Sequence, residues 1–182
     1  PMLSGLARLL KRDHREFQAF QIEISSYSSL ECRICPRAIF AEKWLFQNMP
    51  METYQKIAEN FPGAKWVIFQ GWGDPLENEN FPAMFQLARE AECRTGLVTN
   101  GFHLTAELSA RLIEGKLEFL TVSLEEIPSE EDGLRTGSEL NQILDRVRLL
   151  IRLKKSGKTA QPSVKLSFLM TRLNMSRLPK VI

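Results

Sequence analysis

Cysteine is scarce in this chain, and so are long apolar runs and any excess of charge. There are three cysteines in 182 residues, an odd number without disulfide-framework spacing, which favours a reducing, cytoplasmic setting. No apolar run is long enough to cross a bilayer, and residues 1–4 lack the layout of a signal peptide. The net charge is only +2, with acids and bases interspersed. This balance predicts neither a nucleic-acid partner nor a membrane partner.

Apolar periodicity predicts an alternation of strands and helices. Strands are expected over residues 18–25, 66–70, 96–99, 117–125 and 164–171. Helices are expected over residues 50–60, 82–92, 105–114 and 140–157. We divide the chain into an N-terminal helical leader, residues 1–17, and one domain over residues 18–182, in which residues 174–182 resemble the start of a further helix.

Strands that alternate with helices form parallel sheets with right-handed crossovers. Both a doubly wound sheet and a (β/α) barrel fit this order. Several of the strands also have a polar face, for example Glu23 with Ser25, or Lys165 with Ser167. In a closed sheet such faces would line a lumen. We therefore predict an α/β fold, a partial, TIM-like (β/α) barrel of parallel strands that is truncated after the fifth strand.

The first expected strand leads into a loop with two closely spaced cysteines, Cys32 and Cys35. A Cys-x-x-Cys pair can share a metal centre or form a redox disulfide. The alternatives are two buried small hydrophobic residues or half of a zinc site. The third cysteine, Cys93, is expected at the opposite end of its strand and is interpreted as structural. His103, by contrast, is expected at the same end as the cysteine pair, and we interpret it as a loop residue.

Polar or glycine-rich segments follow each of the five expected strands. Parallel α/β folds carry their chemistry at the C-terminal ends of the strands, so we expect these segments to meet there. They contain Ser28, Cys32 and Cys35; Gly71, Trp72, Gly73 and Asp74; Asn100; Ser123 and Glu125; and Arg172 and Asn174.

The loop and the strand ends together resemble the radical S-adenosylmethionine (radical SAM) superfamily over residues 20–176. That family carries Cys-x-x-x-Cys-x-x-Cys after its first strand, and here the first of the three positions is Ser28. Segment 71–75, Gly-Trp-Gly-Asp-Pro, is similar to the family's Gly-Gly-Glu-Pro motif. The resemblance implies that Cys32, Cys35 and position 28 face a [4Fe-4S] cluster. A serine hydroxyl is a poor substitute for a thiolate.

The same resemblance implies a binding site for S-adenosylmethionine (SAM). Asp74 would pair with the ligand's amino group, Ile34 would meet the adenine through its backbone, and Ser123 and Glu125 would lie near the ribose and methionine ends. The remaining cofactor-binding residues are Gly71, Trp72, Gly73, Asn100, Arg172 and Asn174.

The implied activity is reductive cleavage of SAM to methionine and a 5'-deoxyadenosyl radical, which abstracts hydrogen from a peptide or small-molecule substrate. Peptide or protein modification and cofactor maturation are both compatible with it, and it implies a flavodoxin- or ferredoxin-like electron donor. Ser28 is expected to impair this activity. Two alternatives remain at this point: a degenerate, non-catalytic member that binds a nucleotide or a partner, and an unrelated barrel with a redox Cys-x-x-Cys.

Overall fold

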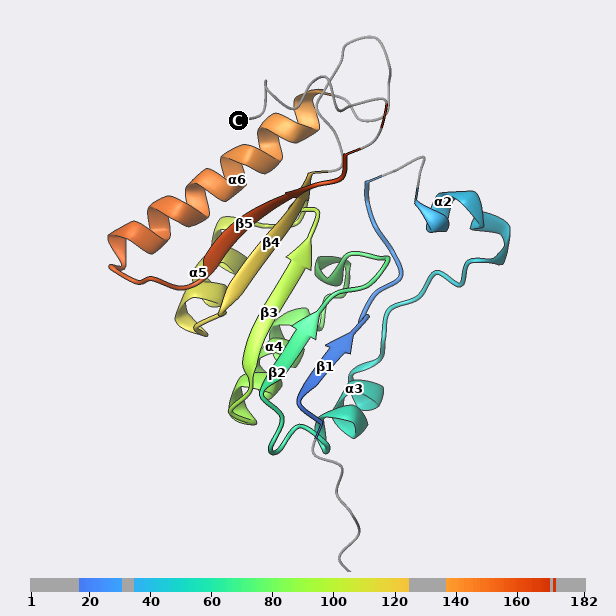
Figure 1. Cartoon of the computed structure of the whole chain (residues 1–182), viewed down its shortest axis with the longest axis vertical. Helices are drawn as coiled ribbons and strands as arrows, with labels where there is room; N and C mark the ends of the chain where they lie inside the picture. The colour runs from blue at the N-terminus through green and yellow to red at the C-terminus, as the bar shows by residue number, and fades with distance from the viewer. Residues whose placement is uncertain (1–16, 31–34, 125–136, 171, 173–182) are drawn as a thin grey trace, which may run out of the picture.

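The expected alternation of strands and helices is present in the computed structural model, which describes residues 17–30, 35–124, 137–170 and 172 (Figure 1). The strands are β1 (Ala19–Ile22), β2 (Trp66–Phe69), β3 (Arg94–Thr99), β4 (Phe119–Leu124) and β5 (Ser163–Phe168). The helices are α2 (Pro36–Ile39), α3 (Met51–Ala58), α4 (Phe81–Glu90), α5 (Ala106–Glu114) and α6 (Gly137–Ser156), with 3₁₀ turns η1 (Ala41–Lys43) and η2 (Pro75–Glu77). The expected leader helix and the segment 174–182 lie outside the described residues.

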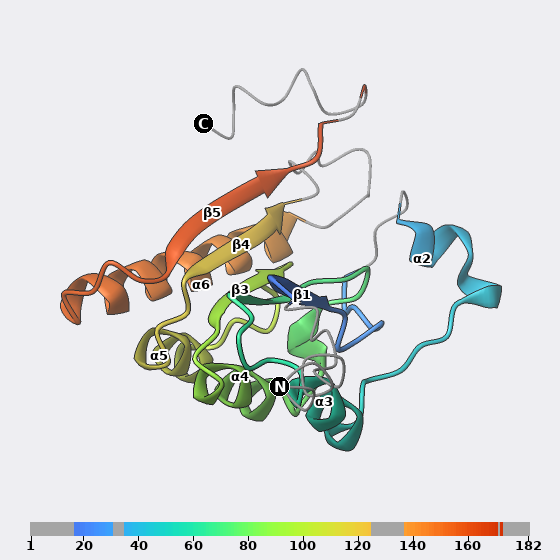
Figure 2. The ribbon, with the colours of Figure 1, turned by 60° about the horizontal axis from the view of Figure 1, so that its bottom comes forward.

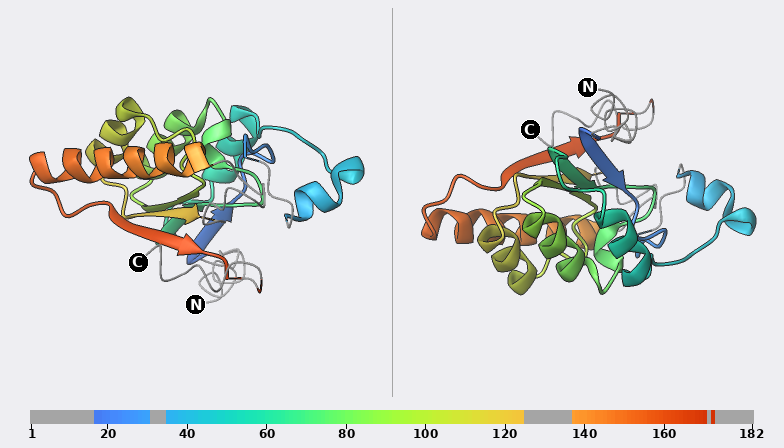
Figure 3. Two further views of the ribbon diagram at one scale, coloured as in Figure 1. Left: turned by 90° about the horizontal axis from the view of Figure 1, so that it is seen from above. Right: turned by 90° about the horizontal axis from the view of Figure 1, so that it is seen from below.

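All five strands pair in parallel and follow the order of the sequence, β1-β2-β3-β4-β5. Helices α3, α4, α5 and α6 cover the same face of this sheet, and the opposite face is open within the described part of the chain (Figures 2 and 3). A doubly wound sheet would carry helices on both faces. The arrangement therefore confirms the prediction of a partial, barrel-like α/β fold.

The side chains of β4 show how the sequence selects the covered face. Leu120, Val122 and Leu124 are buried, whereas Thr121 and Ser123 between them are only half-buried. Successive strand residues point to opposite faces, so the apolar set packs against the helices and the polar set lines the open face. No helix among the described residues is long and apolar enough to span a membrane.

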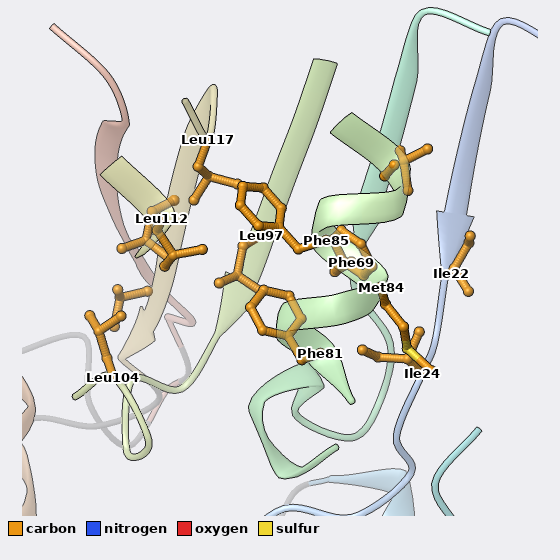
Figure 4. Close-up of a cluster of buried hydrophobic side chains, with 14 of the residues drawn as sticks. Ile22, Ile24, Phe69, Phe81, Met84, Phe85, Leu97, Leu104, Leu112 and Leu117 are labelled. Carbon is orange, nitrogen blue, oxygen red and sulfur yellow. The ribbon is translucent and has the colours of Figure 1, made fainter. Parts of the chain in front are cut away.

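The core lies between the sheet and its helices and is rich in aromatic side chains (Figure 4). Phe69 of β2 meets Phe81 of α4 edge to face, with ring centroids 5.2 Å apart. Leu97 of β3 and Leu112 of α5 are fully buried in the same cluster. This packing fixes each strand relative to the helix that follows it, and with it the positions of the loops at the strand ends.

Local signals explain where several helices begin. The Thr105 hydroxyl accepts a hydrogen bond from the Leu108 N–H at 3.1 Å, which caps α5 as expected. Pro50 directly precedes α3. By contrast, α2 and η1 occupy a stretch in which the sequence has no clear period. They are too short for a periodic apolar face, and none of their residues is buried.

The strand boundaries needed correction in two places. The first strand ends at Ile22 rather than at residue 25, and Ser25 instead forms an isolated antiparallel bridge with Asn48. The fifth strand ends at Phe168 rather than at residue 171. For β1, the alternation of Ile22 to Ser25 continues past the last pair with β2, Ile22 with Phe69. For β5, Phe168 is followed by two further apolar residues, Leu169 and Met170, so the alternation itself ends there.

Candidate functional site

A pocket opens at the C-terminal ends of β1 to β4, where the sequence predicts the site. Eight predicted residues line it: Ser28, Cys35, Gly71, Trp72, Gly73, Asp74, Asn100 and Ser123. Leu30, Arg37, Val98 and Thr99 complete the lining.

The other predicted site residues are not in this lining. Cys32, Ile34, Glu125 and Asn174 lie outside the described residues. Arg172 is described and exposed, and it does not contribute to the pocket.

The turn after β2 depends on two glycines and on a carboxylate from the neighbouring strand end. Glu23 Oε1 accepts hydrogen bonds from the Trp72 N–H at 2.6 Å and the Gly73 N–H at 3.0 Å. A Cβ atom on Gly73 would lie 2.2 Å from the Ser25 carbonyl oxygen and 2.6 Å from the Tyr27 carbonyl oxygen. Only glycine therefore allows the two backbones to approach this closely. The Trp72 side chain is 58% exposed beside the pocket.

Asp74 is buried at the base of the pocket, and its carboxylate is engaged by protein donors. Thr99 Oγ1 donates to it, 2.8 Å from Oδ2, and the Asn100 backbone N–H donates to the same oxygen at 2.6 Å. The Leu76 N–H donates to Oδ1 at 2.9 Å and so caps η2. Burial raises the pKa of Asp74, and these hydrogen bonds act in the opposite direction. The carboxylate thus joins the loops after β2 and β3.

Ser28 is held within a small hydrogen-bond network. Its hydroxyl donates to the Leu30 carbonyl oxygen at 3.3 Å and accepts from Asn100 Nδ2 at 3.2 Å. Cys35, a half-buried free thiol, lines the same pocket. The first and third positions of the expected ligand set therefore meet in one place. Within the described residues, no group of three or more His, Cys, Asp or Glu side chains is arranged to hold a metal ion.

Three polar residues of the site were not identified from the sequence. Thr99 holds Asp74, and Glu23 caps the glycine turn. Arg37 Nη2 donates to the Leu30 carbonyl oxygen at 3.1 Å, which ties the start of α2 to the loop after β1. Two of them had a local signal: Glu23 lies on a polar strand face, and Thr99 ends the expected third strand. Arg37 had none, although its contact with Leu30 spans only seven residues.

The family model described as "Radical SAM superfamily" matches residues 22–182. Among curated proteins, the chain is 26% identical over 166 residues to the tungsten-containing aldehyde ferredoxin oxidoreductase cofactor-modifying protein of Pyrococcus furiosus. That alignment covers 88% of this chain and 46% of the relative, so the chain spans about half of the relative's length.

Two solved structures show a similar fold. BtrN, in complex with AdoMet and 2-DOIA, superposes with a TM-score of 0.57 at 17% identity, covering 84% of this chain and 56% of BtrN. Streptococcus suis SuiB, bound to S-adenosylmethionine, gives a TM-score of 0.56 at 15% identity, covering 98% of this chain and 50% of SuiB. At these identities the likeness concerns the fold alone.

Proposed function

The chain belongs to the radical SAM superfamily, and from that premise we propose that the pocket at its strand ends binds S-adenosylmethionine beside an iron–sulfur site. The observation that carries the proposal is the convergence in one pocket of eight residues that the sequence had assigned to the site. They come from four different strand ends. Such convergence is the usual arrangement of ligand sites in parallel α/β folds.

The described residues fit the ligand's chemistry. The turn from Gly71 to Gly73 offers close backbone approach, and Ser123 and the Trp72 ring provide polar and aromatic contacts along the wall. Ile34, Glu125, Arg172 and Asn174 are further candidates from the family resemblance. Asp74 contributes by holding the Thr99–Asn100 turn against the pocket, so its effect on the ligand is transmitted through that turn.

The residues fit a [4Fe-4S] cluster less well, because only two of the three expected positions are thiols. Cys32 and Cys35 would hold it, and Ser28 stands at the third position. The Ser28 hydroxyl is also engaged as both donor and acceptor. A bound cluster would supply the electron for reductive cleavage of SAM, with a flavodoxin- or ferredoxin-like protein as its donor. We propose that this activity, directed at a peptide, small-molecule or cofactor-precursor substrate, is impaired in this chain.

A second candidate function is binding of a nucleotide or a partner without catalysis. The hydrogen bonds of Ser28 favour it, because they give this position a structural role that does not require a metal. Family membership is incompatible with the remaining alternative, an unrelated barrel with a redox Cys-x-x-Cys.

Calorimetric titration tests the binding step shared by both candidates. We expect SAM to bind saturably with one site per chain, and S-adenosylhomocysteine to compete for that site because it shares the adenosine and the amino-acid ends. Absence of saturable binding at millimolar SAM would contradict the proposal. Iron and sulfide reconstitution of the same protein, followed by its visible absorbance, then separates the two candidates.

A further inference from the structure

A second cluster of polar side chains joins the loops after β1, β2 and β3. His103 Nε2 lies 3.0 Å from Ser29 Oγ and 3.3 Å from Glu77 Oε2. The other carboxylate oxygen of Glu77 accepts a hydrogen bond from the Ser29 backbone N–H. Neither Glu77 nor His103 lines the SAM pocket. Their contacts nevertheless converge on the residue next to Ser28.

The contacts of this cluster centre on Glu77 and His103. The hydrogen bond between Ser29 Oγ and His103 Nε2 can run in either direction, because an imidazole nitrogen can donate or accept. One Glu77 oxygen accepts from the Ser29 backbone N–H, and the other lies in ion-pair contact with His103. The cluster needs no metal to be satisfied.

The contact between Glu77 and His103 differs from an ordinary surface ion pair because the Glu77 side chain is largely buried. The Glu77 side chain is only 15% exposed, and a carboxylate so far from water is costly unless donors replace its hydration. Exposed pairs such as Arg111 with Glu107, at 57% and 77% exposure, contribute little. The Glu77–His103 pair therefore constrains the loop to which it is bonded.

We propose that Glu77 and His103 are positioning residues that hold the loop after β1 at Ser29, beside position 28. They hold Ser29 at the loop's start, and the Arg37 guanidinium holds the Leu30 carbonyl oxygen from the far side of the cysteine segment. The distance between position 28 and Cys35 is thereby set by protein contacts. That this distance matters for assembly of an iron–sulfur cluster rests on the proposed function. That Glu77 and His103 hold Ser29 does not.

Cysteine alkylation in metal-free protein tests the proposal. Cys35 is half-buried on the held loop, and Cys93 is 0% exposed in the core and serves as an internal reference. We expect His103→Ala and Glu77→Ala to raise the rate of Cys35 alkylation by iodoacetamide about two- to tenfold, the factor that corresponds to one net hydrogen bond. His103→Gln and Glu77→Gln, which keep a donor and an acceptor respectively, should restore most of the original rate.

The matched control is Arg148→Ala, which breaks an exposed ion pair with Asp145 on α6 and should leave the Cys35 rate unchanged. Unchanged Cys35 rates in both alanine variants would overturn the proposal. A rise in Cys93 alkylation in step with Cys35 would also overturn it, because it would indicate general destabilisation. The SAM titration is run in parallel, so loss of the proposed function would be seen separately from loss of loop positioning.

Discussion

Asn100 Nδ2 donates a hydrogen bond to Ser28 Oγ across 3.2 Å, and so joins the loop after β3 to the loop after β1. Asn100 is itself fixed through its backbone N–H, which donates to Asp74. Position 28, where the family pattern has its first cysteine, is therefore linked through Asn100 to the buried carboxylate of Asp74. A side chain placed there is oriented by the protein before any cofactor binds.

Replacement of Asp74 by Ala tests this chain of hydrogen bonds. We expect weaker SAM binding, by on the order of 1.5–3 kcal/mol, because the Thr99–Asn100 turn loses its acceptor and moves away from the pocket. Thr99→Val removes the hydroxyl, which donates to Asp74 and accepts from the Gly101 N–H, but it keeps the side-chain shape and the Asn100 N–H bond to Asp74. It should therefore produce a smaller loss. Calorimetric titration measures both variants. Equal affinities for the original and the Asp74→Ala protein would contradict this role.

Asp74 should also make stability depend on pH. Burial raises its pKa, so the folded protein holds the proton more tightly than the unfolded chain does. The resulting stabilisation is complete below the unfolded pKa, about 3.9, and is lost as pH rises through the folded pKa. We expect the free energy of unfolding of the original protein, relative to that of Asp74→Asn, to fall from about pH 4 upwards. Urea unfolding over this range would contradict the prediction if the difference stayed constant or grew.

Gly73 is the position where the pocket tolerates substitution least. A Cβ there would lie 2.2 Å from a backbone oxygen of the β1 loop, which cannot move aside as a flexible side chain can. We expect Gly73→Ala to reduce SAM affinity at least about tenfold, a cost typical of backbone displacement at a ligand site. Gly157→Ala is the matched control, because its Cβ would lie 3.4 Å from its nearest neighbour. Similar losses in both variants would indicate a general effect of the substitution.

Two features of the sequence predicted the fold and most of the described site: its apolar periodicity, and the polar segments that follow each expected strand. The helix over 106–114 follows from Thr105 as its cap, and the single covered face of the sheet follows from the alternation in β4. Each is a local signal. The residues at strand ends could be grouped because parallel strands place their C-terminal ends on one edge.

The direction in which Asp74 points could not be predicted in the same way. The family resemblance suggests a carboxylate that faces the ligand, whereas here its oxygens face Thr99, Asn100 and Leu76. The choice depends on burial and on two of these donors, Thr99 and Asn100, which lie 25 and 26 residues away along the chain. No motif contains that information. Likewise, His103 gave no local indication of its contact with Ser29, which lies 74 residues earlier.

Ser28→Cys is the substitution that bears most directly on catalysis. It exchanges one atom, oxygen for sulfur, at a position that lines the same pocket as Cys35. We expect bound iron after anaerobic reconstitution to rise towards about four per chain, the content of one [4Fe-4S] cluster. The Asn100 amide would then donate to the new sulfur and keep it oriented. Dithionite-dependent formation of 5'-deoxyadenosine from SAM should appear in the same preparation.

Ser29→Cys is the matched control for that substitution, because it adds a thiol one residue away on the side of His103. It should gain neither iron nor deoxyadenosine. If both cysteine variants gain iron equally, the loop accepts metal without regard to position, and the ligand role of position 28 is wrong. If Ser28→Cys gains iron but yields no deoxyadenosine, the cluster site is intact and SAM is not held productively. That outcome would favour the non-catalytic binding function, because restoring the missing thiolate would not have restored the chemistry.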